Sequence, residues 1–102
     1  MKTDVLNMSL CEVAQAIRRK RVSSLEVTQA CIERAKAVQP AVNCFIAIEE
    51  DEALRAARAA DRAVKRGAKL GPLHGVPLAH KDMFYRAGRV STMGSNVTNP
   101  RP

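Results

Sequence analysis

The pattern Ser-x-x-Glu occurs twice in the first part of this sequence, at residues 9–12 and 23–26, and an apolar periodic stretch follows it each time. In such a capping box the serine accepts a hydrogen bond from a first-turn amide, and the glutamate reaches back to the amide of the serine. The apolar residues that follow recur at the spacing of one helix face. The sequence therefore predicts helices at about residues 10–21 and 24–39, the second of them stopped by Pro40.

A third helix is predicted at about residues 51–66, where acidic residues precede basic ones as the helix dipole favours. Gly67 follows it as a residue suited to a helix C-terminus. Between the second and third helices, residues 42–48 are apolar and rich in β-formers, so we expect a strand or an extended connection there. Because 16 of the 102 residues are alanine and only 3% are aromatic, the helices should enclose a thin core.

The composition of the chain changes after Gly67. Glycine and proline become frequent, and an apolar run at about residues 76–82 follows. We interpret this run as a buried strand with Lys81 near its carboxyl end, where α/β sheets border their ligand crevice. Poor solvation there would lower the pKa of a lysine from about 10.4, as a neutral lysine base requires. The plain alternative is a solvated Lys81 beside an ion-paired Asp82.

The segment from Gly71 to Asp82 reads Gly-Pro-Leu-His-Gly-Val-Pro-Leu-Ala-His-Lys-Asp. It resembles the amidase signature family, whose members carry a Gly-Pro-Leu-x-Gly-x-Pro-x-x-x-Lys-Asp motif. The resemblance implies an α/β fold of which residues 1–102 form the N-terminal part of a single domain, the helices plus the lysine-bearing strand. It also implies that Lys81 is the base of a Ser–cis-Ser–Lys triad, taking a proton from the cis-serine, which in turn activates the nucleophilic serine.

The family's glycine- and serine-rich segment, which holds both serines and the oxyanion-hole amides, has no counterpart in these 102 residues. We therefore expect the chain to stop before the nucleophile and to be inactive by itself. In a full-length enzyme the resemblance implies hydrolysis of a small-molecule carboxamide without a cofactor. One alternative is a part of a glutamyl-tRNA amidotransferase that is like its A subunit, which would need partner proteins. Another is a small basic helical binding module.

The binding-module alternative rests on charge, since the formal net charge is +7. Four cations share one side of the third predicted helix, Arg55, Arg58, Arg62 and Lys65, and a second cluster occupies residues 18–21. Such a surface suits phosphates. No aromatic residue is interleaved with these cations, however, so there is no ring on which a nucleic-acid base could stack. We favour a solvated helix face and do not expect a nucleic-acid partner.

His74, His80 and Asp82 are the candidates for a metal site. Three ligands of these types are the minimum for a catalytic zinc, but their spacing matches no familiar motif. We expect no metal.

The three cysteines, Cys11, Cys31 and Cys44, lie in apolar stretches and lack a CxxC spacing. We expect reduced, buried thiols in a cytoplasmic protein. No apolar run approaches the roughly 20 residues of a membrane span, and no leader peptide is recognised. A homodimer is left open.

Overall fold

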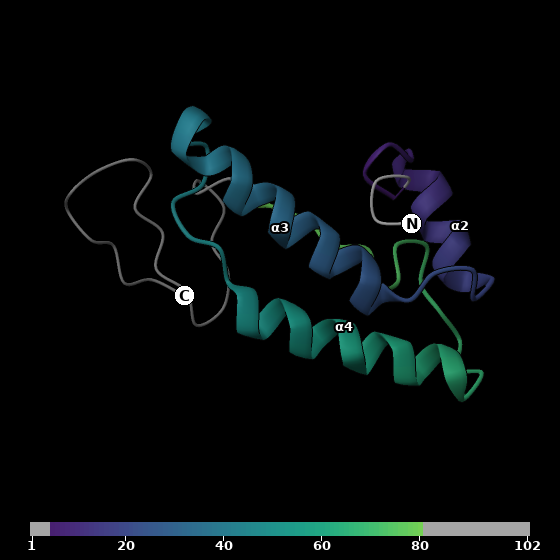
Figure 1. Cartoon of the computed structure of the whole chain (residues 1–102). Coiled ribbons are helices and arrows are strands. Elements are labelled where there is room, and N and C mark those ends of the chain that lie inside the picture. The colour runs from purple at the N-terminus through teal and green to yellow at the C-terminus, as the bar shows by residue number, and fades with distance from the viewer. Residues whose placement is uncertain (1–4, 81–102) are drawn as a thin grey trace.

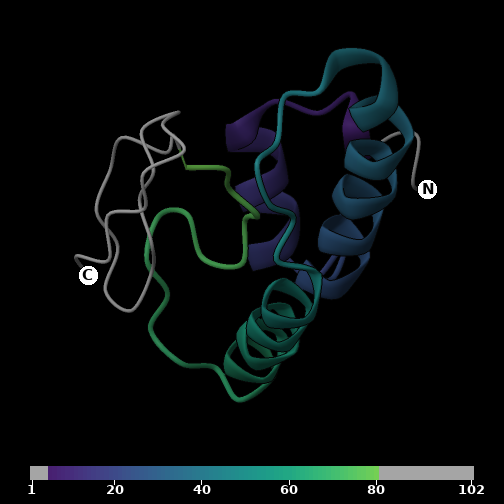
Figure 2. The ribbon, with the colours of Figure 1, turned by 90° about the vertical axis from the view of Figure 1, so that its left-hand side faces the viewer.

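The computed structural model describes residues 5–80 of the chain, and three helices have their full bounds within that range. Helix α2 spans Leu10–Arg18, α3 spans Ser24–Val42 and α4 spans Glu50–Lys65 (Figure 1). Helices α3 and α4 pack side by side, and the segment after α4 turns back past α2 and the start of α3 (Figures 1 and 2). The three helices predicted from the sequence are therefore present.

Helix α2 begins with the predicted capping box. The Ser9 amide donates to Glu12 Oε1 at 2.9 Å, and the Glu12 amide donates to Ser9 Oγ at 3.2 Å. The helix ends at Arg18 rather than near residue 21, because Lys20 adopts a left-handed φ of 62°. The amide of Arg21 then donates to the Ala16 carbonyl at 2.9 Å, a bond that closes the last turn.

Helix α3 begins with the second predicted box and continues through Pro40, which was predicted to stop it. Proline removes one amide donor from a helix, and here only two further helical residues follow, so the loss does not interrupt a long ladder. The helix ends instead at Asn43, whose φ of 48° is left-handed and whose amide donates to the Gln39 carbonyl at 2.7 Å. Asparagine tolerates this conformation better than most residues.

The connection at residues 43–49 contains no strand, and Val42, the first residue of the stretch predicted as a strand or extended connection, is the last residue of α3. Gln39 holds its start by a two-bond contact with the backbone of Phe45. The Phe45 amide donates to Gln39 Oε1 at 3.0 Å, and Gln39 Nε2 donates to the Phe45 carbonyl at 2.7 Å. Helix α4 then follows the prediction closely, with acidic residues in its first turn and basic residues in its last.

The core lies where α2, the first half of α3 and the segment after α4 meet, and it is thin as predicted. Its centre holds Ile17 and Val27, which are 1% and 2% exposed. Four of the ten buried hydrophobic residues are alanine, and no aromatic side chain is among them in the described part of the chain. The surrounding members are Val5, Val13, Ala16 and Val22, with Met8, Cys31, Val64 and Val76 packed against them.

The strand predicted at residues 76–82 is not formed over residues 76–80, and residues 81 and 82 lie outside the described range. A strand needs a neighbour for its ladder, and none of residues 5–80 forms one. Val76 bonds instead to the turn before it, its amide donating to the Leu73 carbonyl at 3.1 Å. The described fold is helical, and the predicted α/β class has no support within it.

The cysteine prediction is correct in part. All three thiols are free, but Cys11 and Cys44 are exposed and only Cys31 is partly buried. Burial raises the pKa of the Cys31 thiol above its ordinary value. Among residues 5–80, no helix is long and apolar enough to cross a bilayer.

Candidate functional site

The loop at residues 71–76, here called the anchored loop, forms the first half of the Gly71–Asp82 motif and is fixed to all three helices. Four of its residues, Gly71, His74, Gly75 and Val76, contact residues far away in the sequence. Figures 1 and 2 show it running beside α2 and the start of α3. The remaining residues of the motif therefore continue from the side of the molecule on which the anchored loop lies.

Gly75 lies in close contact with the start of α3 and with α2. Ser24 Oγ donates to the Gly75 carbonyl at 2.6 Å, and Ser24 is only 1% exposed. Gly75 has a φ of +79°, and a Cβ added there would lie 3.1 Å from Ser24 Cβ and 3.3 Å from Ile17 Cγ2. Both the backbone conformation and the space therefore require glycine at this position.

Asp61, on α4, fixes the backbone of Ser24, the residue that donates to Gly75. Its Oδ1 accepts from the Ser24 amide at 2.6 Å and its Oδ2 from the Leu25 amide at 3.0 Å. These are the first amides of α3, where the positive end of the helix dipole favours a carboxylate. With the Ser23 box serving the next amide, that of Glu26, at 3.0 Å, the exposed donors at the start of α3 are accounted for.

His74 and Arg18 fix the other points of the loop. His74 Nε2 lies 2.9 Å from the Ala60 carbonyl. Because a carbonyl oxygen only accepts, Nε2 carries the proton in this contact. Arg18 Nη2 donates to the Gly71 carbonyl at 2.9 Å. Arg18, a member of the basic cluster at residues 18–21, therefore helps to fix the anchored loop.

The structure does not bring the three candidate metal ligands together. His74 bonds the backbone of α4, His80 is exposed, and Asp82 lies outside residues 5–80. Within that range no three histidine, cysteine or acidic side chains are close enough together to hold a metal ion.

Lys81, the predicted catalytic base, also lies outside the described residues, which end at His80. What the structure gives is the anchoring of the loop ahead of it, with Gly75 six residues upstream.

The sequence reasoning missed Ser24 and Asp61. A signal for Asp61 was available, because it is the only acidic residue between Glu52 and Asp82. A lone carboxylate in a basic stretch often has a specific partner. Ser24 offered only its place directly after a capping serine.

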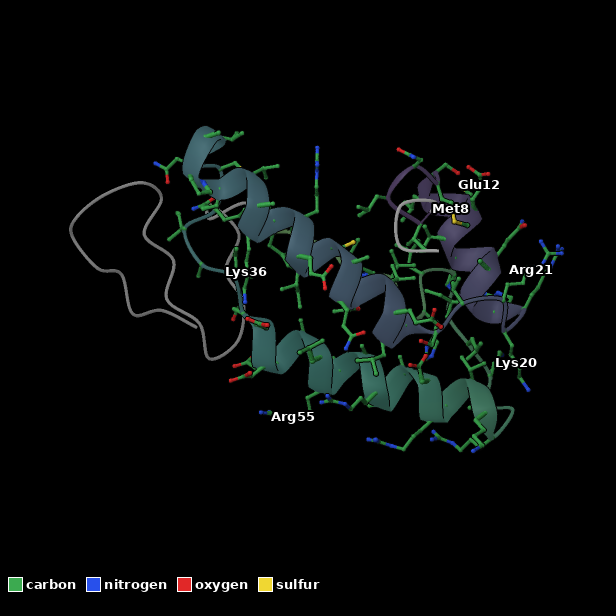
Figure 3. The ribbon with its side chains drawn as sticks, in the orientation of Figure 1. Met8, Glu12, Lys20, Arg21, Lys36 and Arg55 are labelled. Atoms are coloured by element: carbon green, nitrogen blue, oxygen red, sulfur yellow. The ribbon has the colours of Figure 1, made fainter. Side chains whose placement is uncertain are left out.

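The basic residues predicted for α4 are exposed, as are those of the cluster at residues 18–21. Figure 3 shows Arg55 pointing away from α3, whereas Lys36 points from α3 toward the start of α4. There Lys36 forms an ion pair with Glu50 across the two helices. A shallow groove of about 270 Å³ lies beside this pair, lined by residues of α3 and α4 that include Ile32 and Leu54. It holds none of the residues predicted for catalysis.

Comparison with known proteins places this sequence in a family. The family model described as Amidase matches residues 26–102, which include the anchored loop and Lys81. The chain therefore belongs to the amidase signature family.

The curated relatives it matches include the A subunit of the glutamyl-tRNA(Gln) amidotransferase of Acidothermus cellulolyticus, which is 44% identical over 95 residues, 93% of this chain. The proteins of the same name from Azoarcus sp. and Streptomyces coelicolor are 42% and 39% identical over 91% and 93% of the chain. In each case the chain spans 19% of the relative's length, about a fifth. No solved structure gives a significant match.

Proposed function

We propose that residues 1–102 are the N-terminal part of an amidase-signature domain and that Lys81 is its catalytic base. The observation that carries the proposal is the Gly71–Asp82 motif within a family match that covers residues 26–102. Consistent with this, the first half of the motif is fixed by long-range hydrogen bonds to α2, α3 and α4. A catalytic side chain is placed precisely when the residues that support it are themselves held by packing and hydrogen bonds.

The proposed reaction is hydrolysis of a carboxamide through an acyl-enzyme. Neutral Lys81 accepts a proton from the cis-serine, which accepts one from the nucleophilic serine as that oxygen attacks the amide carbonyl. The C–N bond breaks, the amine or ammonia leaves with a proton, and water then releases the carboxylic acid. Both serines and the oxyanion-hole amides lie outside these 102 residues, so the chain alone should not hydrolyse amides.

The test is substitution of Lys81 in the full-length amidase that carries this segment. Lys81→Ala should lower kcat by about 10⁴-fold or more, as loss of a triad member does elsewhere. Lys69→Ala is the matched control, because Lys69 is an exposed lysine just ahead of the anchored loop. It should leave kcat unchanged. Retention of activity by Lys81→Ala would refute the proposal.

A role in a glutamyl-tRNA amidotransferase, like that of its A subunit, is the second candidate, because the relatives named above carry that name. In that case partner proteins would take part, and ammonia freed from an amide would be passed to an acceptor instead of being released into solution. Comparing amide hydrolysis with and without the added partner proteins separates the two. A simple amidase shows full turnover without them.

The basic binding module is the candidate from another class, and it rests on the exposed cations of α4. It predicts a salt-dependent mobility shift with RNA or DNA near physiological ionic strength. Absence of that shift would remove it.

A further inference from the structure

We infer that Ser24 and Asp61 are positioning residues for Lys81, an inference that rests on the proposed amidase function. Together they form a connected pair, here called the Ser24–Asp61 bracket, that joins α4 to the start of α3 and the start of α3 to the anchored loop. None of these atoms would contact substrate. Their task is to fix the point from which the chain runs to the catalytic lysine.

The bracket has two steps, and each leaves little freedom. Asp61 fixes the backbone of Ser24 and Leu25 through bonds of 2.6 and 3.0 Å. With that backbone held, the position of Ser24 Oγ depends on one torsion, and Oγ donates to the Gly75 carbonyl at 2.6 Å. Because Ser24 is only 1% exposed, water has little access to replace this bond.

The position of Gly75 limits where Lys81 can lie. Lys81 follows Gly75 by six residues, and a stretch of that length spans about 20 Å at most. The hydrogen bond from Ser24 to the Gly75 carbonyl therefore fixes where this stretch begins. A misplacement of about 1 Å in a catalytic constellation costs about 10²-fold in rate, so a small loosening of this anchor is large enough to measure.

Helix capping explains the contacts of Asp61 but not the bond from the Ser24 hydroxyl to the loop. Ser23 already supplies the capping box of α3, accepting from the Glu26 amide at 3.0 Å, while its own amide donates to Glu26 Oε1 at 3.1 Å. The Ser24 hydroxyl adds nothing to that box, since it points to the loop. The competing explanation is that Gly75 and Val76 are held by packing alone, with Ser24 Oγ merely satisfied.

Ser24→Ala and Ser23→Ala form a matched pair that separates these explanations. They are the same change at adjacent positions of one helix start, yet only Ser24 reaches the loop. The first readout is amide hydrogen exchange in the 102-residue chain at the two internal bonds of the loop, those of His74 and Val76. Ser24→Ala should speed exchange at both about tenfold relative to core amides of α3, as expected when one net hydrogen bond is lost. Ser23→Ala should not change that ratio.

The second readout is steady-state kinetics in the full-length amidase that carries this segment. Ser24→Ala and Asp61→Asn should lower kcat about 10–100-fold with KM within about twofold, because the base is displaced while the substrate site stays intact. Ser23→Ala should lower thermal stability and leave kcat within about twofold. A kcat for Ser24→Ala equal to that of Ser23→Ala, or an unchanged exchange ratio, overturns the inference.

Failure of the positioning role and failure of the proposed function give different results. If Lys81→Ala is inactive while Ser24→Ala matches Ser23→Ala, Lys81 is the base but the bracket does not position it. If Lys81→Ala stays active, the proposed function fails and the positioning role fails with it, whatever the exchange experiment gives.

Discussion

The two ends of α3 use the same kind of contact in different surroundings. At its start, Asp61 binds two backbone amides, and the residue it binds is buried and bonded onward to Gly75. At its end, Gln39 binds the backbone of Phe45 with two bonds, but the chain around it is open. Val42 is 60% exposed and Ile46 is 73% exposed.

This difference shows which end of the helix is coupled to distant parts of the chain. The start of α3 connects α4 to the anchored loop and is enclosed by core residues such as Ile17 and Val27. The contact at its end, between Gln39 and Phe45, joins residues close together in the sequence. Perturbations at the start should therefore reach the motif, while perturbations at the end should stay local.

The largest expected effect comes from removing the charged contact. Asp61→Ala should lower the free energy of unfolding by about 2–4 kcal/mol, because two charge-assisted bonds in a partly buried site are lost. Gln39→Ala, which removes two neutral bonds at the open end, should cost about 1 kcal/mol. Urea denaturation of both variants measures the difference. Equal losses would mean that the two ends are energetically alike.

Gly75→Ala should come next, with a loss of about 2–3 kcal/mol, because the new Cβ meets both a left-handed backbone and close neighbours. Gly67→Ala is its control. Gly67 has a similar φ of +73°, but nothing lies within 4 Å of an added Cβ, so the cost should be about 1 kcal/mol, from the backbone alone. If the two variants unfold at the same urea concentration, the contact with Ser24 is not a tight one.

Pro40→Ala should stabilise the chain by about 1 kcal/mol, since alanine restores an amide donor near the open end of α3 and suits a helix better. The gain is smaller than for a mid-helix proline because proline also restricts the unfolded chain. Pro72→Ala, in the turn of the anchored loop, should show no gain. Thermal unfolding of the two variants tests this, and destabilisation by Pro40→Ala would contradict it.

The smallest expected effect concerns the reactivity of the cysteine thiols, compared between the first half of α3 and the chain beyond its end. Burial raises the pKa of Cys31, so less of it is thiolate at about pH 8, and thiolate is the species that reacts. Cys31 should be alkylated several-fold more slowly than Cys44, which is exposed beyond the end of α3. Mass spectrometry of a timed iodoacetamide reaction resolves the sites. Exposed Cys11 should behave like Cys44, and a Cys31 rate equal to both would show that the first half of α3 is open to solvent.

Much of the fold was predictable because its signals are local. Both capping boxes formed as the sequence indicated, and α4 begins and ends within about a residue of its prediction. The errors fall where local signals compete with context. Lys20 is left-handed inside a predicted helix, and Pro40 lies within a helix that it was predicted to stop.

The motif was also recognisable from the sequence, but its support was not. Glycine and proline spacing pointed to residues 71–82, yet the predicted strand over residues 76–80 did not form, since the described chain offers it no partner strand. A strand depends on a partner that may lie anywhere in the sequence, so an apolar run alone does not specify it.

The sequence by itself determined where the helices start, the thin alanine-rich core and the family to which the motif belongs. Only the tertiary structure decided that Asp61, Ser24 and Gly75 act as one chain of contacts, although they are separated by 37 and 51 residues. The physical reason is that a capping box is made by near neighbours within one helical turn, whereas the bracket exists only once α3, α4 and the anchored loop have packed together and excluded water.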